Sequence, residues 1–113
     1  MIKIYHNPRC RKSRETLKLI REAGHEPEII EYLKNPPSAS ELKELLERMG
    51  KKPMEIIRKG EEVFKSNFKG RTFSDDEWIR IMVENPKLIE RPIVIKGDEV
   101  RLGRPPETVR EIL

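Results

Sequence analysis

The pattern of apolar and polar residues predicts two strands and a helix at the start of the chain. Residues 2–5 predict a short buried strand, residues 11–23 an amphipathic helix that ends at Gly24, and residues 28–33 a second strand. A strand, a helix and a second strand at this spacing form a right-handed βαβ unit with parallel strands. We therefore expect the first third of the chain to be such a unit.

The middle of the chain has the period of helices. Ser38 and Ser74 are each followed by a glutamate three residues later, and this capping-box pattern predicts that a helix begins at each serine. Pro53 predicts the first turn of a short helix with Arg58 at its end, and residues 61–68 predict one or two further helical turns. We expect a helical insertion over about residues 38–86.

The last third returns to strands. Residues 93–95 and 100–102 flank Gly97-Asp98, a pattern typical of a β-hairpin, and Pro105-Pro106 begins a terminal helix. The predicted order is βαβ, then helices, then ββα. It resembles an α/β thioredoxin-like core that carries a helical insertion between its halves. At 113 residues, we expect one domain over residues 1–113.

Composition narrows the range of partners and compartments. The chain has 24 basic and 20 acidic residues, interleaved on predicted helix faces, so we expect a solvated monomer that binds no nucleic acid. The sequence has no signal peptide and no apolar run long enough to span a bilayer, so we expect no membrane association. A single cysteine forms no internal disulfide, which favours a cytoplasmic location.

The single cysteine, Cys10, lies where the first strand gives way to the first helix. The positive end of the helix dipole, its free N–H groups and the neighbouring cations all favour a thiolate there; the cations are Arg9, Arg11 and Lys12. His6, four residues earlier, could stabilise the thiolate or order the loop. We therefore predict a reactive cysteine that meets an anionic substrate.

Two other interpretations of this loop are open. A lone cysteine is often a small buried hydrophobic residue, but the charged surroundings of Cys10 argue for an exposed thiol. Ser13 occupies the place of a second cysteine, so no vicinal disulfide forms and an outside thiol must resolve any adduct of Cys10. Ser13 either binds the thiolate or caps the helix, and capping is the favoured role.

Three arginines stand beside structural landmarks. Arg91 precedes Pro92 at the entry to the third strand, Arg104 follows the hairpin, and Arg58 lies in the insertion. Any one arginine in this basic chain is by default a surface charge. Guanidinium groups nevertheless suit tetrahedral oxyanions, because they offer two parallel donors and keep their charge. No metal-ligand cluster is visible in the sequence, and we predict no metal site.

Five motifs occur in order along almost the whole chain, and together they resemble the glutaredoxin-coupled arsenate reductase family, which shares its fold with Spx-type regulators. The likeness is greatest to the short, arsenate reductase-like members. The motifs are His6-Asn7-Pro8-Arg9-Cys10-x-Lys12-Ser13-Arg14, Tyr32-Leu33-x-x-Pro36, Ile57-Arg58-Lys59, Glu90-Arg91-Pro92-Ile93-Val94 and Gly103-Arg104-Pro105-Pro106-Glu107.

The resemblance implies a reaction and a set of roles. Cys10 would attack arsenate, glutathione would enter as co-substrate with no bound cofactor, and glutaredoxin would reduce the resulting mixed disulfide. His6 would help to keep the thiol ionised, and Pro92 would be a cis-proline. The residues that we assign to substrate binding are Ser13, Arg58, Arg91 and Arg104.

One departure and two alternatives accompany this assignment. Arg11 stands where reductases of the family often have a small residue, so it could crowd the pocket or favour another anion. The first alternative is a Spx-type regulator that binds RNA polymerase, although Ser13 removes the CxxC switch usual in that group. The second is a monothiol, glutathione-linked oxidoreductase with a substrate other than arsenate.

Overall fold

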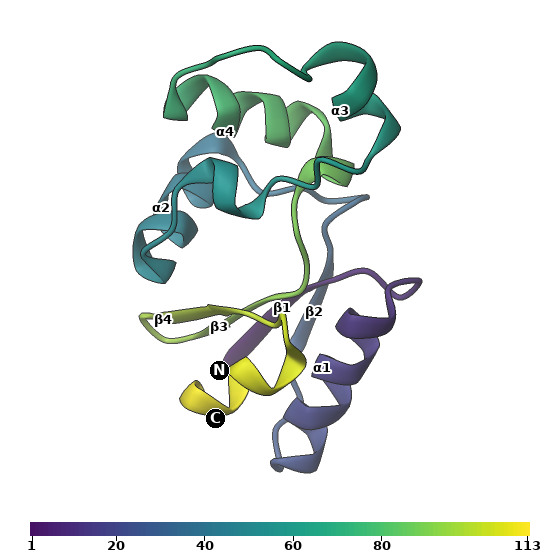
Figure 1. Cartoon of the computed structure of the whole chain (residues 1–113). Coiled ribbons are helices and arrows are strands. Elements are labelled where there is room, and N and C mark those ends of the chain that lie inside the picture. The colour runs from purple at the N-terminus through teal and green to yellow at the C-terminus, as the bar shows by residue number, and fades with distance from the viewer. The chain divides into compact units, whose positions relative to one another are not determined.

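A four-stranded mixed sheet and a group of helices make up the chain, shown in Figure 1. The structure is a computed structural model that describes all residues, 1–113. The chain forms two compact units. The sheet unit comprises Met1–Asn35 and Arg91–Leu113, and the helical unit comprises Pro36–Glu90. The sequence places the insertion at residues 38–86, slightly inside these bounds. The assignment of the whole chain to one domain stays a prediction.

The sheet has the strand order β2-β1-β3-β4. β1 (Ile2–His6) pairs in parallel with β2 (Glu28–Glu31), and it pairs antiparallel with β3 (Ile93–Lys96) on its other side. β3 and β4 (Glu99–Leu102) form the antiparallel hairpin. The predicted α/β class, the parallel βαβ unit and the C-terminal hairpin are therefore all confirmed.

Two helices cover one face of this sheet. α1 (Arg11–Glu22) follows β1, and the 3₁₀ helix η3 (Pro106–Ile112, yellow in Figure 1) follows the hairpin. The alternation of β1 turns its isoleucines toward these helices. The result is one apolar cluster of Ile2, Ile4, Ile20, Val94, Val109 and Ile112, each at most 4% exposed. This cluster fixes α1, and with it the residues at the start of α1, against the sheet.

The second strand is shorter than predicted. It ends at Glu31 rather than at residue 33, because the N–H groups of Lys34 and Asn35 turn back and donate to the Glu31 carbonyl at 2.9 and 3.0 Å. Tyr32 is nevertheless 1% exposed. A buried aromatic residue that follows a strand looks in sequence like a continuation of that strand, which explains the error.

The helical unit contains α2 (Ala39–Met49), the 3₁₀ helix η1 (Pro53–Ile56), α3 (Glu62–Asn67), α4 (Asp75–Glu84) and the 3₁₀ helix η2 (Pro86–Leu88). Both predicted capping boxes are confirmed. Ser38 Oγ accepts the Glu41 N–H at 3.1 Å, and Ser74 Oγ accepts the Glu77 N–H at 3.2 Å. These side chains satisfy N–H groups that the first turn of a helix leaves without intrahelical partners.

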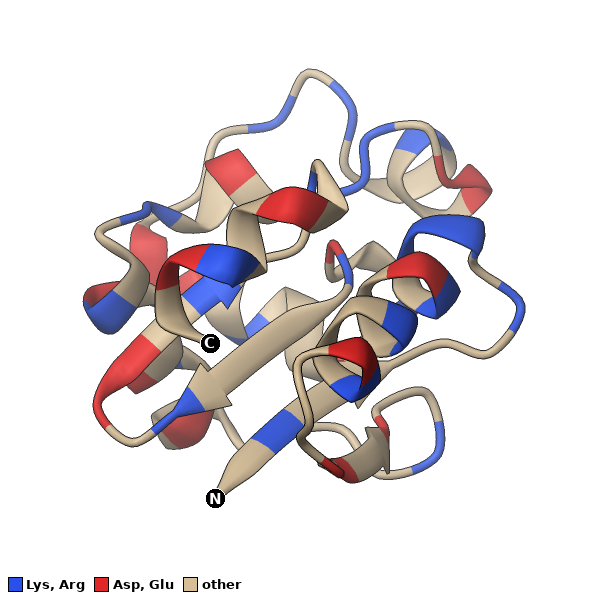
Figure 2. Cartoon of the chain, turned by 90° about the horizontal axis from the view of Figure 1, so that it is seen from below, with Lys and Arg blue, Asp and Glu red and all other residues tan.

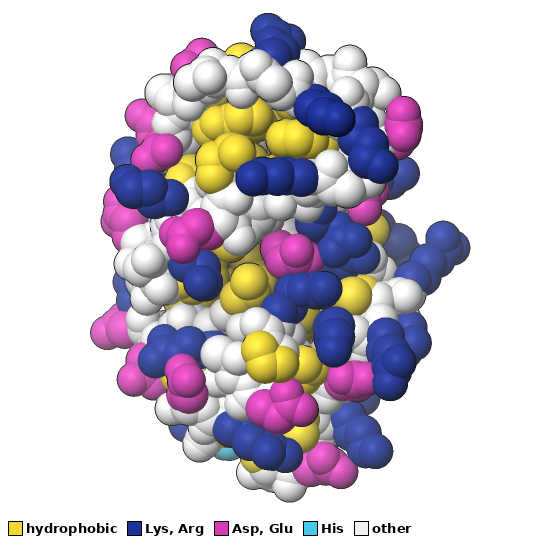
Figure 3. Space-filling model, in the orientation of Figure 1, with side chains coloured by type: hydrophobic (Ala, Val, Ile, Leu, Met, Phe, Trp, Pro, Cys, Tyr) yellow, Lys and Arg dark blue, Asp and Glu magenta, His cyan; other side chains and the backbone are white.

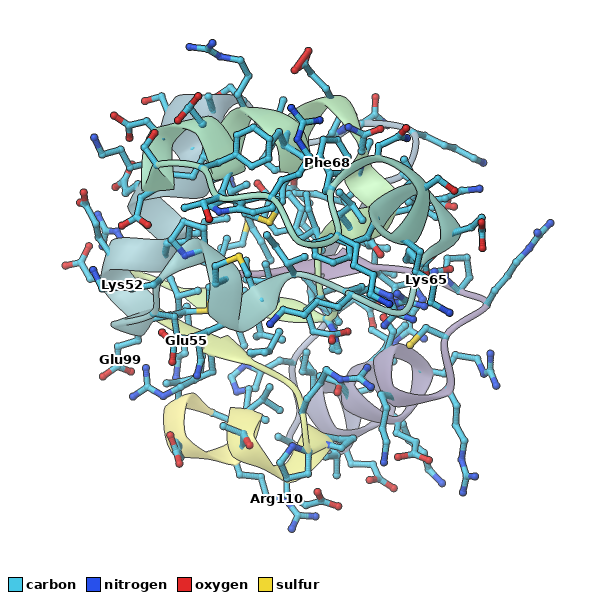
Figure 4. All side chains as sticks on the ribbon, turned by 45° about the horizontal axis from the view of Figure 1, so that its top comes forward. Lys52, Glu55, Lys65, Phe68, Glu99 and Arg110 are labelled. Atoms are coloured by element: carbon cyan, nitrogen blue, oxygen red, sulfur yellow. The ribbon has the colours of Figure 1, made fainter.

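The short helix at Pro53 ends before Arg58, contrary to the prediction. Lys52 N donates to Glu55 Oε2 at 2.6 Å at the start of this turn, and the two residues lie next to each other in Figure 4. The helix stops at Ile56 because the next residues pair with another segment. Arg58 N donates to Leu88 O at 2.8 Å, and Glu90 N donates to Ile56 O at 2.8 Å.

An aromatic cluster forms the packing of the helical unit. The ring of Trp78, 3% exposed, meets Phe73 edge-on with 4.8 Å between centroids, and it stacks on Phe64 at 6.1 Å. Phe68, labelled in Figure 4, contacts both Phe73 and Trp78. The interpretation of these four aromatic residues as packing residues is confirmed.

Charged residues of both signs are interspersed over the ribbon in Figure 2 and over the face shown in Figure 3. This distribution agrees with the interleaved pattern of the sequence. None of the helices has both the length and the apolar character that crossing a bilayer requires.

Candidate active site

Cys10 is the N-cap residue of α1, at the end of a tight loop that leaves β1. Its φ and ψ of −93° and 122° are extended, so the chain enters the helix directly after it. The loop is held by Asn7, whose carbonyl accepts the Cys10 N–H at 2.9 Å and whose Oδ1 accepts the Arg9 N–H at 3.0 Å. The strand and the helix thus place the thiol at the positive end of α1.

Cys10 is buried, at 9% exposure, whereas the sequence predicts an exposed thiol. The charged neighbours do not expose it, because their side chains point to solvent. Arg11 is the extreme case: its side chain is 83% exposed and pairs with Glu15 at 2.8 Å, so it does not crowd the thiol. Charge along the loop therefore does not indicate exposure of the cysteine that lies within it.

Several groups act on the Cys10 sulfur. Burial raises the pKa of the thiol, and this is the largest single effect. Hydrogen bonds and a nearby positive charge together outweigh this effect of burial. The backbone N–H of Ser13 contributes most, followed by the charge and the side-chain hydrogen bond of Arg91, and then by the backbone N–H of Lys12. The net result is a pKa below the ordinary value of a cysteine. Cys10 is therefore biased toward the nucleophilic thiolate.

Arg91 and Arg104 belong to the C-terminal part of the sheet unit, where Arg91 precedes β3 and Arg104 follows β4. The Arg91–Pro92 peptide bond is cis, and so is the Arg104–Pro105 bond, which the sequence analysis did not anticipate. Arg104 Nη1 donates to the Arg91 carbonyl at 3.2 Å, and Gly103 N donates to the Pro92 carbonyl at 2.8 Å. The structure thus brings the segments of Arg91 and Arg104 together, and the Arg91 side chain hydrogen-bonds to Cys10.

Ser13 does not cap α1, contrary to the favoured prediction. Its hydroxyl is fully buried and lies 2.6 Å from Nδ1 of His6, and it also accepts the Asn7 N–H at 3.1 Å. Ser13 is the third residue of the helix, three positions after the N-cap residue Cys10, so it is too far along the chain to act as the N-cap. Its side chain therefore connects the helix to the loop, while its backbone N–H donates a hydrogen bond to the Cys10 thiolate. The assignment of Ser13 to substrate binding stays a prediction.

His6 is 6% exposed at the end of β1. Burial lowers the pKa of its imidazole. The negative charge of Glu31 raises that pKa, whereas the positive charges of Arg21 and Arg14 lower it further, and the net result is a pKa below the ordinary value of 6.5. At neutral pH the ring is accordingly uncharged. His6 is also not among the groups that lower the pKa of Cys10. Of its two predicted roles, the geometry favours ordering the loop, and a catalytic role stays a prediction.

Arg58 belongs to the helical unit, where two carboxylates engage it. Its Nη1 lies 2.7 Å from Glu90 Oε1, and its Nε lies 3.3 Å from Glu61 Oε2. The three side chains are between 21% and 29% exposed. This pairing outweighs partial burial and raises the pKa of Arg58 further. The role of Arg58 in substrate binding stays a prediction.

Sequence reasoning missed two residues that shape the site. The first is Asn7: an asparagine in a loop often accepts a hydrogen bond from the backbone two residues ahead, as it does here. The second is Gly103, because a glycine can signal a close approach of the backbone to a neighbouring segment. No group of three or more His, Cys, Asp or Glu side chains is arranged to hold a metal ion.

Comparison with known proteins agrees with this arrangement. The model of the ArsC family matches residues 5–112. The chain belongs to the ArsC family. The resemblance drawn from the five motifs is thereby confirmed.

Relatives of known sequence and structure match the full length. The uncharacterized protein YfgD of Escherichia coli K12 is 48% identical, over 99% of this chain and 96% of its own. The arsenate reductase of Haemophilus influenzae is 45% identical, with 97% of each chain covered. The solved structure of an arsenate reductase from Vibrio cholerae is 47% identical and has a TM-score of 0.93, covering 99% of this chain and 97% of that one.

Proposed function

We propose that this ArsC-family protein reduces arsenate to arsenite, with Cys10 as the nucleophile and glutathione and glutaredoxin as the source of electrons. The observation that carries the proposal is the stabilised thiolate: backbone N–H groups of α1 and the Arg91 guanidinium together lower the pKa of a buried cysteine. Relatives that match the full length of this chain are named arsenate reductases.

The donors around Cys10 suit a tetrahedral oxyanion. The start of a helix offers free N–H groups and a partial positive charge, and both favour an anion. Arg91 adds a guanidinium whose Nε is buried and has no hydrogen-bond partner in the chain. A buried donor without a partner is unfavourable, and an oxyanion beside Cys10 would supply that partner. We assign Arg91 and Arg104 to binding the substrate oxygens.

In the proposed first step, the Cys10 thiolate attacks arsenic in dihydrogen arsenate. An S–As bond forms, one As–O bond breaks, and the oxygen leaves as water after taking up protons. Arsenic remains As(V) in this cysteine adduct. Negative charge on the arsenic oxygens is held by donors already in place, which is the most effective form of electrostatic stabilisation.

In the proposed second step, the sulfur of glutathione attacks the Cys10 sulfur. The S–As bond breaks and its electron pair stays on arsenic, which leaves as As(III) in arsenite, while the two sulfurs form a mixed disulfide. A second glutathione, through glutaredoxin, then reduces that disulfide and restores the Cys10 thiol. The sum is one arsenate and two glutathiones converted to arsenite, glutathione disulfide and water.

The surface of the loop supports an anionic thiol as the partner. Arg9, Arg11, Lys12 and Arg14 are all exposed and flank Cys10 in the chain. Glutathione carries two carboxylates, and such cations would raise its local concentration. We further propose a cytoplasmic location, because a reducing compartment keeps a lone cysteine as a thiol. We also propose a monomer, because few large hydrophobic side chains are exposed.

The decisive experiment is a coupled assay with NADPH, glutathione, glutathione reductase and glutaredoxin, with and without arsenate. Arsenate-dependent NADPH oxidation is expected for the natural protein and is expected to vanish in Cys10→Ser. Arg110→Ala, an exposed position on η3 of the sheet unit, is the control for removal of an unrelated charge.

Other outcomes would redirect the assignment. Glutathione-dependent turnover on small disulfides without any response to arsenate would favour the monothiol oxidoreductase. Full arsenate turnover in Cys10→Ser would overturn the nucleophile. Absence of all thiol turnover, with binding to RNA polymerase, would favour the Spx-type regulator.

A further inference from the structure

Gly103 is buried between two segments of the sheet unit that flank the candidate active site. A Cβ atom at this position would lie 2.7 Å from Thr16 Oγ1 and 2.8 Å from Pro92 Cγ, both well inside van der Waals contact. Its φ is not in the left-handed region, so backbone conformation does not require glycine here. The requirement is one of space between α1 and the Arg91–Pro92 segment.

Neither neighbour can easily move away. Thr16 is 0% exposed, and its hydroxyl donates to the Lys12 carbonyl at 2.8 Å, which ties it to the first turn of α1. Pro92 is buried, and its ring has little freedom. A side chain at residue 103 must therefore displace either the start of α1 or the Arg91–Pro92 segment, since protein interiors have no spare volume.

Hydrogen bonds join the same segments. Gly103 N donates to Pro92 O at 2.8 Å, and Arg104 Nη1 donates to Arg91 O at 3.2 Å. The end of β4 thus holds the Arg91–Pro92 segment from one side, and Thr16 bounds it from the other. Lys12, whose carbonyl accepts the Thr16 hydrogen bond, also donates its backbone N–H to the Cys10 sulfur.

We propose that Gly103 is a positioning residue: its lack of a side chain sets how closely the Arg91–Pro92 segment approaches the start of α1, and thereby places the Arg91 guanidinium beside the Cys10 sulfur. The proposal concerns the thiolate itself rather than the substrate. Its test uses no arsenate, so a failure of the proposed arsenate reduction leaves it standing.

The matched control is Gly60. This glycine also has an ordinary φ, and a Cβ there would meet nothing within 4 Å. Gly60→Ala therefore tests the general effect of replacing a glycine by alanine, whereas Gly103→Ala adds the methyl group between Thr16 and Pro92. The other glycines of the chain have positive φ values and would add backbone strain.

The experiment measures the rate of Cys10 alkylation by iodoacetamide against pH for both variants and the natural protein. Gly103→Ala is expected to raise the midpoint of the profile and to slow alkylation below that midpoint by about threefold or more, since each pKa unit changes the thiolate fraction about tenfold. Gly60→Ala is expected to retain the natural profile. Circular dichroism and thermal unfolding check that each variant is folded.

A double-mutant cycle separates positioning from a general packing defect. If Gly103 acts through Arg91, Gly103→Ala has little further effect on the profile in an Arg91→Ala background, because the charge that it displaces is already absent. Additive effects of the two substitutions, or an unchanged profile in folded Gly103→Ala, would overturn the proposal.

A second variant covers the case in which Gly103→Ala does not fold. Adding Thr16→Ala removes the atoms that the new Cβ would meet at 2.7 and 3.2 Å, and it leaves the contact with Pro92 at 2.8 Å. The displacement then falls on the Arg91–Pro92 segment, and the same upward shift of the profile is expected. A folded double variant with the natural alkylation profile would contradict the proposal.

Discussion

Nδ1 of His6 and Oγ of Ser13 lie 2.6 Å apart in a buried hydrogen bond that joins the last residue of β1 to the first turn of α1. The loop between them carries Cys10. The same hydroxyl accepts the Asn7 N–H, so one side chain fixes both ends of the loop. Ser13 also serves the thiolate through its backbone N–H. The side chain of Ser13 thus orders the loop, and its backbone N–H stabilises the thiolate. A substitution at residue 13 removes the first interaction and keeps the second.

Ser13→Ala is expected to lower the free energy of unfolding by about 1–3 kcal/mol, because it leaves buried polar groups of His6 and Asn7 without their partner. The shift in the Cys10 pKa is expected to be smaller than that caused by Arg91→Ala, since the backbone N–H remains. Urea unfolding and alkylation profiles measure the two effects. Ser66→Ala, on an exposed helix position, is the control and should change stability by less than about 0.5 kcal/mol.

The protein is expected to lose stability as the pH falls below about 6.5. Burial lowers the pKa of His6 in the folded state, so below the unfolded value of 6.5 the unfolded chain binds more protons at this residue than the folded chain does. The free energy of unfolding then falls with pH. Urea titrations at pH 7.5, 6.5 and 5.5 measure this slope.

His6→Asn isolates this effect, because asparagine does not titrate. The difference in unfolding free energy between the natural protein and His6→Asn should shrink as the pH falls through this range. The control is His25→Gln, which removes the other histidine of the chain. A difference that stays constant with pH would show that His6 does not cause the loss.

Arg91→Ala is expected to raise the pKa of Cys10, because the variant loses both the charge and the hydrogen bonding of the guanidinium. Alkylation below the midpoint should slow by about threefold to tenfold. Arg91→Lys keeps the charge without the planar fork and should restore part of the rate. Arg110→Ala, which projects outward at the lower edge of Figure 4, is the control. A large fall in melting temperature for Arg91→Ala would instead indicate a structural arginine.

Arg58 and Glu90 should be energetically coupled. Their contact is 2.7 Å long and both side chains are less than 25% exposed, so a double-mutant cycle with Arg58→Met and Glu90→Gln is expected to give about 0.5–3 kcal/mol of coupling in unfolding free energy. The exposed pair Arg11–Glu15 is the comparison and should give about 0.3–0.5 kcal/mol. Equal coupling in the two cycles would show that partial burial adds nothing.

Features that depend on neighbouring residues could be predicted from the sequence. Both capping boxes at Ser38 and Ser74 involve a serine and a glutamate three residues apart, so the sequence alone contains the whole interaction. The hairpin around Gly97-Asp98 is equally local. The parallel pairing of the first two strands also follows, because the helix between them returns the chain to the end of the sheet at which the first strand began.

Features that depend on distant residues could not be predicted in this way. The burial of Cys10 and the partner of the Ser13 hydroxyl depend on how α1 packs against β1, and the composition of the loop gives no indication of either. The contact of Gly103 with Thr16 and Pro92 joins three separate segments of the chain. In each case the deciding quantity is a distance that only the packed fold defines.

The order β2-β1-β3-β4 leaves two strands of the sheet with one unpaired side each, β2 and β4. Both have only four residues, and charge interrupts both: glutamates end β2 at Glu28 and Glu31, while Glu99 and Arg101 lie in β4. A foreign strand that pairs there would gain few hydrogen bonds and would bring its own side chains against these charges. We therefore expect the sheet to resist growth by added chains.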